Sequence, residues 1–227
     1  MKLSIIIPIY NEAALIETVL ERVRAAVPAD HELILVDDCS RDGTRDILKL
    51  EEKKPDTIVV YHDVNKGKGA AIRTGLKHAT GDIVIVQDAD MEYDPRDIPR
   101  VIAPIIEGKT NVAYGSRFLG SVEKMALPNY VANQILAWLV TILFFHRITD
   151  EATAYKAFRA DVIHSIELKC NRFEFCPEVT AKVLRKGEKI IETPITFSAR
   201  TFEQGKKIGW RDFITAVWTL LKYRFVK

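Results

Sequence analysis

The chain has 227 residues, of which 48% are hydrophobic and 28% charged, a composition typical of a globular protein with a sizeable core. A formal net charge of +2 argues against a general nucleic-acid-binding protein, and no nucleic acid partner is expected. Three cysteines without a CxxC pair argue against a disulfide framework, and the opening MKLSIIIPIY does not resemble a signal peptide. We therefore expect a reducing, cytoplasmic location.

Strand and helix patterns alternate along the first half of the chain. Continuous apolar, β-branched runs predict buried strands, whereas helical spacing after Asn11, an expected N-cap, and after Pro95 predicts intervening helices. This alternation predicts an α/β fold with a mostly parallel sheet flanked by helices. After Arg117 the rhythm changes to long helices and one further strand. The predicted strands are 3–9, 32–36, 57–61, 82–87, 111–116 and 189–197, and the long apolar helical segments are 130–145 and 213–225.

Polar residues follow each of the first four predicted strands. Ligands of parallel sheets bind beyond the carboxyl ends of the strands, so these residues are expected to gather on one rim. They are Tyr10, Asn11 and Glu12 after the first strand, Asp37 and Asp38 after the second, 65–69 after the third, and Asp88 and Asp90 after the fourth.

Asp88 and Asp90 point the same way if the chain there is extended, because they are two residues apart. Two carboxylates about 4 Å apart repel by about 4 kcal/mol at an effective dielectric near 20. A divalent cation reverses that sign, and oxygen ligands suit Mg²⁺ or Mn²⁺. The alternative is that these aspartates only cap the following helix. The turn GKGAAI (67–72) lacks the third glycine of a dinucleotide site, but a lysine in a glycine-rich turn before a helix can still face a phosphate; the alternative is a flexible turn with exposed lysines.

Five motifs follow in order: IIIPIYNE, LVDDCSRDGT, NKGKGAAIRTGL, GDIVIVQDADMEYDP and YGSRF. In this order and spacing they resemble the family 2 glycosyltransferases of GT-A fold, and among them the dolichyl-phosphate mannose synthase and polyprenyl-phosphate glycosyltransferase group. The match covers 3–118 and continues more loosely through 149–163, 171–187 and 199–213. The resemblance implies one Rossmann-like glycosyltransferase domain over 1–227, with a nucleotide-sugar half (1–118) and a helical acceptor half (119–227).

The resemblance also implies roles for matching positions. Asp88, Ala89 and Asp90 form the DxD motif that holds Mg²⁺ or Mn²⁺ and the donor diphosphate, and Glu92 stands where relatives often carry glutamine as a further metal ligand. Asp38 is expected to hydrogen-bond the base or ribose, and Arg117 to face phosphates. Asp90, Arg117 and Arg200 are the expected catalytic residues. The remaining expected nucleotide-sugar residues are Pro8, Tyr10, Glu12, Val36, Asp37, Lys68, Lys206 and Lys207.

The acceptor is less clearly indicated. Relatives that use a lipid phosphate often have an arginine after the GSR strand, but here no arginine lies between Arg117 and Arg147, and Lys124 is a weaker substitute. A lipid phosphate needs no general base, whereas a hydroxyl acceptor does, with Asp150 and Glu178 as candidates. The open hypotheses are transfer to a polyprenyl or dolichyl phosphate, transfer to a saccharide or other hydroxyl, and nucleotide-sugar binding without turnover.

A membrane surface is one expected partner. From Thr196 to Lys227 there are seven basic and two acidic residues, a net charge of +5. The segment 213–225 mixes aromatic and aliphatic residues with Lys222 and Arg224, a pattern typical of an interfacial helix near anionic lipid. This pattern predicts a peripheral location on the cytoplasmic face of the membrane, with core packing or a dimer contact as the alternative. The oligomeric state is not predicted.

Overall fold

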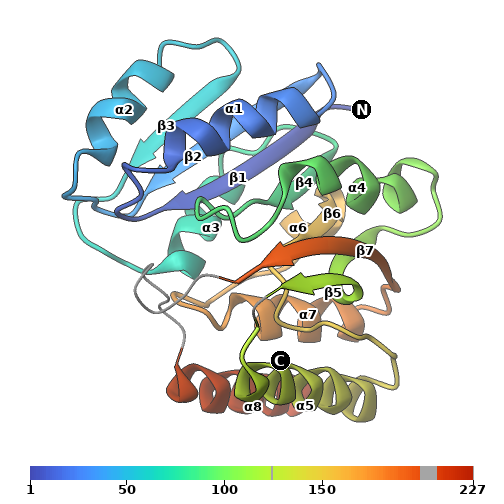
Figure 1. Ribbon diagram of the computed structural model, residues 1–227. Coiled ribbons are helices and arrows are strands. Elements are labelled where there is room, and N and C mark those ends of the chain that lie inside the picture. The colour runs from blue at the N-terminus through green and yellow to red at the C-terminus, as the bar shows by residue number, and fades with distance from the viewer. Residues whose placement is uncertain (124, 200–208, 227) are drawn as a thin grey trace.

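The computed structural model describes residues 1–123, 125–199 and 209–226. Its centre is a seven-stranded sheet in the order β3-β2-β1-β4-β6-β5-β7 (Figure 1). All pairings are parallel except those of β6, which runs antiparallel to both β4 and β5. The strands are β1 (Leu3–Ile9), β2 (His31–Asp37), β3 (Thr57–Tyr61), β4 (Ile83–Val86), β5 (Val112–Glu123), β6 (Lys156–Arg159) and β7 (Ile190–Ser198).

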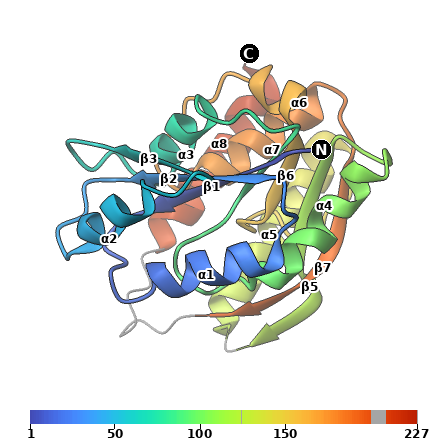
Figure 2. The ribbon, with the colours of Figure 1, turned by 90° about the horizontal axis from the view of Figure 1, so that it is seen from above.

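Helices cover both faces of the sheet, so the predicted α/β architecture is confirmed. Because successive strand residues point to opposite faces, Ile5 and Ile7 pack against α1, α2 and α4, whereas Ile6 packs in the core formed with the other helices. Figure 2 shows α1 and α2 on the opposite side of β1 and β2 from α3 and α7. The helices are α1 (Ile16–Ala26), α2 (Thr44–Glu51), α3 (Lys68–Leu76), α4 (Ile98–Ile106), α5 (Leu127–Phe144), α6 (Ala160–His164), α7 (Phe175–Arg185) and α8 (Trp210–Phe225), with the 3₁₀ helix η1 (Pro95–Asp97) before α4.

Two expectations about local structure need correction. Asn11 is not the N-cap of α1, which begins at Ile16 after Leu15; instead Asn11 adopts a φ of +55° and its side chain accepts a hydrogen bond from the Arg41 amide. The fifth strand continues beyond Ser116 to Glu123, with an irregularity between Ser116 and Ser121, because it follows β7 along most of its length.

The long apolar segments form α5 and α8, which pack against each other and lie side by side at the bottom of Figure 1. In the described part of the chain, α5 is the one helix long and apolar enough to cross a membrane by length and composition, with a mean hydropathy of 1.3. Its inward side belongs to the protein core through Leu136, Ala137 and Val140. Its outer side is exposed at Trp138 and Phe145.

Candidate active site

A cleft of about 850 Å³ lies beyond the carboxyl ends of the parallel strands, where the sequence predicts the polar rim. The loops after β1 to β4 contribute polar residues to its wall, and α5, α7 and α8 contribute further residues. Ten of the residues named from the sequence lie in its wall: Pro8, Tyr10, Glu12, Asp38, Lys68, Asp88, Ala89, Asp90, Glu92 and Arg117.

Three acidic residues that follow β4, Asp88, Asp90 and Glu92, lie in the cleft wall. The Lys68 ammonium lies 2.6 Å from Asp88 Oδ1, and Asp90 Oδ1 accepts a hydrogen bond of 3.1 Å from the Glu92 amide. Burial, followed by repulsion from Asp88 and Glu92, raises the pKa of Asp90 to about 7. Burial alone lowers the pKa of Lys68, but the Asp88 carboxylate outweighs that effect and raises it. The site therefore concentrates negative charge in a poorly solvated place.

This charge pattern fits a divalent cation, because a cation relieves the repulsion that raises the pKa of Asp90. The donors are carboxylate oxygens, as Mg²⁺ and Mn²⁺ prefer, and these ions commonly take one or two carboxylates together with substrate phosphates. Within 1–123, 125–199 and 209–226, no three His, Cys, Asp or Glu side chains converge to form a metal cage by themselves. Asp88, Asp90 and Glu92 are the residues that would hold the ion.

Arg117 lines the cleft but is already paired. Its Nε and Nη2 atoms donate to the two carboxylate oxygens of Asp150, each at 2.7 Å, and its backbone amide donates to Asp150 at 3.0 Å. Burial alone lowers the pKa of Arg117, but Asp150 outweighs it and raises the pKa, so the guanidinium stays charged. Glu192 in turn accepts hydrogen bonds from the Thr149 and Asp150 amides. Arg117 thus has a fixed orientation and a largely neutralised charge.

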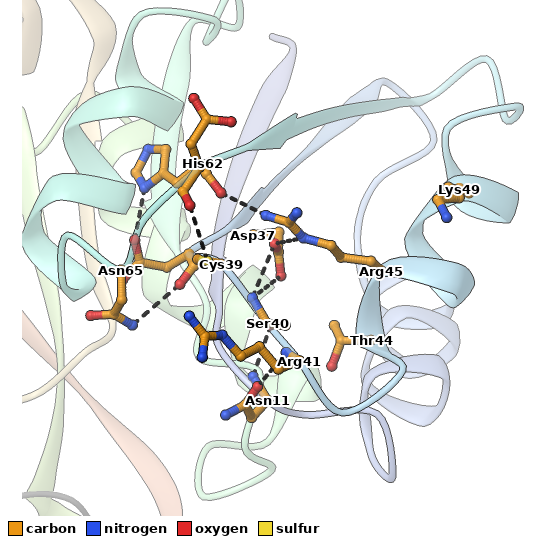
Figure 3. Close-up of polar contacts among 12 residues, drawn as sticks. Asn11, Asp37, Cys39, Ser40, Arg41, Thr44, Arg45, Lys49, His62 and Asn65 are labelled. Atoms are coloured by element: carbon orange, nitrogen blue, oxygen red, sulfur yellow. Dashed lines mark hydrogen bonds and ion pairs between the residues drawn. The ribbon is translucent and has the colours of Figure 1, made fainter.

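Asp38 holds the glycine-rich turn in place. Its carboxylate accepts hydrogen bonds from the amides of Lys66 at 2.8 Å and Gly67 at 2.7 Å, and from the His62 ring at 2.7 Å. Its backbone carbonyl accepts a further bond from Asn65 (Figure 3). A contact from Asp38 to a base or ribose would therefore be added to a carboxylate that already positions the backbone.

Two of the expected nucleotide residues lie outside the cleft wall. Val36 is in the core, and the buried Asp37 carboxylate accepts a 2.7 Å bond from Arg45 and bonds from the Ser40 amide (Figure 3). Side chains inside β2 point into the layers on either side of the sheet, and the cleft wall begins with the next residue, Asp38.

Neither candidate general base lines the cleft. Asp150 is fully buried against Arg117, and Glu178 is fully buried and accepts hydrogen bonds from the Lys169 and Cys170 amides. Both carboxylates act as structural anchors instead. The expectations for Lys124, Arg200, Lys206 and Lys207 fall outside the described residues.

The second half of the chain contributes cleft residues that the sequence reasoning did not assign. Arg172 and Phe173 come from the loop before α7, and Phe213 comes from α8. The sequence NRFEF belongs to the looser part of the family resemblance, which is the signal that pointed to this loop. Nothing in its composition showed that it packs beside residues more than a hundred positions earlier.

A comparison with family models matches residues 4–164 to "Glycosyl transferase family 2". The chain belongs to glycosyl transferase family 2. The family expected from the five motifs is therefore confirmed. The fold is confirmed too: the glucosyl-3-phosphoglycerate synthase of Mycobacterium tuberculosis, solved with Mn²⁺, UDP and phosphoglyceric acid, superposes over 100% of this chain and 79% of that one with a TM-score of 0.76 at 20% identity.

Curated relatives within this glycosyltransferase family act on lipid phosphates by name. The dolichol-phosphate mannosyltransferase of Pyrococcus furiosus is 30% identical over 98% of this chain, which spans 64% of that relative's length. The undecaprenyl-phosphate mannosyltransferase of Micrococcus luteus is 29% identical over 92% of this chain and 88% of its own. A UDP-N-acetylglucosamine–dolichyl-phosphate N-acetylglucosaminyltransferase of Methanococcus voltae is 33% identical over 84% and 83%.

Proposed function

We propose that this protein transfers a sugar from a nucleoside diphosphate sugar to a polyprenyl or dolichyl phosphate, with inversion at the anomeric carbon. The observation that carries the proposal is a single cleft whose wall contains both the acidic residues Asp88, Asp90 and Glu92 and residues of the apolar helices α5 and α8. The named relatives differ in the sugar that they transfer but share a polyprenyl phosphate acceptor. The acceptor class is therefore the firmer part of the proposal, and the donor is of the GDP-mannose or UDP-sugar type.

The chemistry follows from the charges in the cleft. A divalent cation held by Asp88, Asp90 and Glu92 would stabilise the negative charge of the departing nucleoside diphosphate. Lys68 pairs with the Asp88 carboxylate at 2.6 Å and fixes its orientation. A lipid phosphate attacks through an oxygen that is already anionic at neutral pH, so no side chain has to remove a proton. The structural roles of Asp150 and Glu178 are consistent with this mechanism.

We further propose that the outer faces of α5 and α8 lie on a membrane surface, where such an acceptor resides. On α5 the exposed apolar residues recur every three or four positions, so they form one stripe, and α8 adds Trp210, Ile214, Trp218 and Phe225. Arg211, Lys222 and Arg224 on α8 supply positive charge suited to anionic lipid headgroups. The exposed apolar residues of α5 are Leu127, Tyr130, Val131, Ile135, Trp138 and Ile142, with Phe145 at its end.

The decisive experiment follows a radiolabelled sugar. Candidate nucleotide sugars are first screened with Mn²⁺ for a rise in melting temperature, since a ligand that binds only the folded state stabilises it. The best donor is then incubated with undecaprenyl or dolichyl phosphate vesicles. Label in an organic-extractable product supports the proposal, whereas label in a water-soluble saccharide supports a hydroxyl acceptor. Nucleotide binding without release of nucleoside diphosphate for any acceptor would indicate a binding module.

A further inference from the structure

The loop before α7 is held in one conformation by hydrogen bonds to nearly every part of its backbone. Four successive amides, of residues 169–172, donate to two carboxylates: the first two to Glu178 at 2.9 and 2.6 Å, and the last two to Glu174 at 3.0 and 3.1 Å. Arg73 on α3 donates from one nitrogen to two carbonyls of the same loop and to the Asn171 side chain at 3.1 Å. A loop fixed to this degree binds a ligand with little further loss of backbone entropy.

The same loop occupies the start of α3, which sequence alone suggests as a phosphate site. The amide of Gly69 donates to the Arg172 carbonyl and that of Ala70 to the Asn171 carbonyl, both at 3.0 Å. The amides of Lys66 and Gly67 just before the helix donate to Asp38. Four of the amides that a glycine-rich turn would offer to a phosphate are therefore taken by the protein itself.

The Arg172 side chain projects from this loop into the cleft wall and is exposed to solvent. Among the described residues of the cleft, the other two cations are both engaged: Lys68 with Asp88 and Arg117 with Asp150. Arg172 has no carboxylate within salt-bridge distance in the described part of the chain. Among the described cleft residues, the guanidinium of Arg172 is thus the cation that no carboxylate neutralises.

The surroundings of Arg172 combine this charge with apolar surface. Phe173 follows it in the same loop, and Phe213 and Ala216 of α8 line the cleft as well. A phosphate attached to a hydrocarbon chain matches such a pair of surfaces, because guanidinium binds phosphate with two parallel hydrogen bonds while aromatic side chains cover the chain. The donor diphosphate, by contrast, would be bound through a divalent cation held by Asp88, Asp90 and Glu92.

We propose that Arg172 binds the phosphate group of the prenyl phosphate acceptor. This inference rests on the proposed function and extends it, because it places the cation for the acceptor in the loop before α7 instead of after the GSR strand.

The test uses the full chain with farnesyl phosphate as a short acceptor and farnesol as its uncharged counterpart. Binding of both is measured in detergent with Mn²⁺ and nucleoside diphosphate present, alongside transfer kinetics. The wild type is expected to prefer the phosphate. Arg172→Ala is expected to weaken farnesyl phosphate binding, and to raise its KM, by about tenfold to a hundredfold, as for a lost charge-assisted hydrogen bond. Farnesol binding and nucleotide affinity are expected to stay unchanged, and Arg172→Lys to recover part of the loss.

Lys77→Ala is the matched control, because it removes one exposed positive charge just after the end of α3, and Lys77 does not line the cleft. Equal losses of farnesyl phosphate affinity in the two variants would show that any nearby positive charge has the same effect, and would overturn the proposal. A weaker nucleotide affinity with unchanged farnesyl phosphate binding would assign Arg172 to the donor. If the wild type bound farnesyl phosphate through Arg172 but transferred no sugar, this result would contradict the proposed reaction and still support the proposed phosphate site.

Discussion

At the scale of single residues, stability and the proposed function place opposite demands on Asp90. Its partly buried carboxyl lies near two other acids, an arrangement that costs stability unless a cation is bound. We predict that Asp90→Asn leaves the apo protein folded and at least as stable, yet weakens Mn²⁺-dependent nucleotide binding by about tenfold or more. Calorimetric titration with and without Mn²⁺ checks this, with the exposed Asp46→Asn as control. An unchanged nucleotide affinity would remove Asp90 from the metal site.

Glu32 is a stabilising carboxylate remote from the cleft. Burial opposes its charge, but hydrogen bonds from Lys2, Ser4 and Thr80 outweigh it and lower its pKa to about 2. An acid with a lowered folded pKa stabilises the protein above its unfolded pKa, near 4.5, and loses that effect as the pH falls toward 2.

We therefore predict that Glu32→Gln lowers the free energy of unfolding by about 1–2 kcal/mol at pH 7, allowing for solvent screening. The difference from wild type should persist down to about pH 5 and shrink between pH 4.5 and 2. Urea unfolding across this range measures it, with exposed Glu21→Gln as the control. A difference that grows on acidification would contradict the assignment.

Residues whose role depends on local sequence were predictable, and residues whose role depends on distant partners were not. Asp88 and Asp90 follow a buried strand, so their place on the rim could be read from the pattern. The partner of Arg117 lies 33 positions further along the chain, and no spacing rule joins it to Asp150. Arg172 was missed for the same reason, since its loop reaches the cleft only by docking on α3.

At the scale of elements, the contact between α3 and the loop before α7 depends on glycine. A Cβ atom at Gly69 would lie 2.8 Å from the Arg172 carbonyl oxygen and 3.0 Å from the Cys170 sulfur. Helix propensity alone predicts that Gly69→Ala stabilises α3 by about 1 kcal/mol. We predict the opposite sign, a loss of about 1–3 kcal/mol, because the loop must shift to admit the methyl group. Urea unfolding measures the sign of the change. A gain in stability would show that the loop moves aside at little cost.

The elements themselves were predicted unevenly, and the reason is how continuous the apolar pattern of each strand is. Long apolar runs such as those of β1 and β3 were located at their observed bounds. The four-residue β6 carries too little pattern to be recognised, and its place in the sheet comes from antiparallel pairing with β4 and β5. The packing of α5 on α8 likewise joins segments about 80 residues apart, which periodicity cannot show.

At the scale of the whole molecule, the sheet unites the two halves that the family resemblance distinguishes. Strands β1 to β4 bring the acidic rim, while β6 and β7 lie after residue 118 and bring the loops and helices that complete the cleft. The loops after β1 to β4 and the apolar helices α5 and α8 are therefore parts of one folded unit and line one cleft (Figure 1).

The last prediction concerns that surface. Trp138 on α5 and Trp218 on α8 are 67% and 65% exposed, and such indole rings favour the membrane interface. Replacing both with glutamate adds charge where apolar contact is expected. The affinity of the Trp138→Glu, Trp218→Glu variant for anionic vesicles, measured by co-sedimentation, should therefore fall by about tenfold or more. Nucleotide binding should be retained, since neither residue lines the cleft. Leu50→Glu on α2, a 60% exposed apolar site in the opposite helical layer, is the control and should sediment like the wild type. Equal sedimentation of all three proteins would exclude these helices as the membrane contact and leave a partner protein or a second copy to cover them.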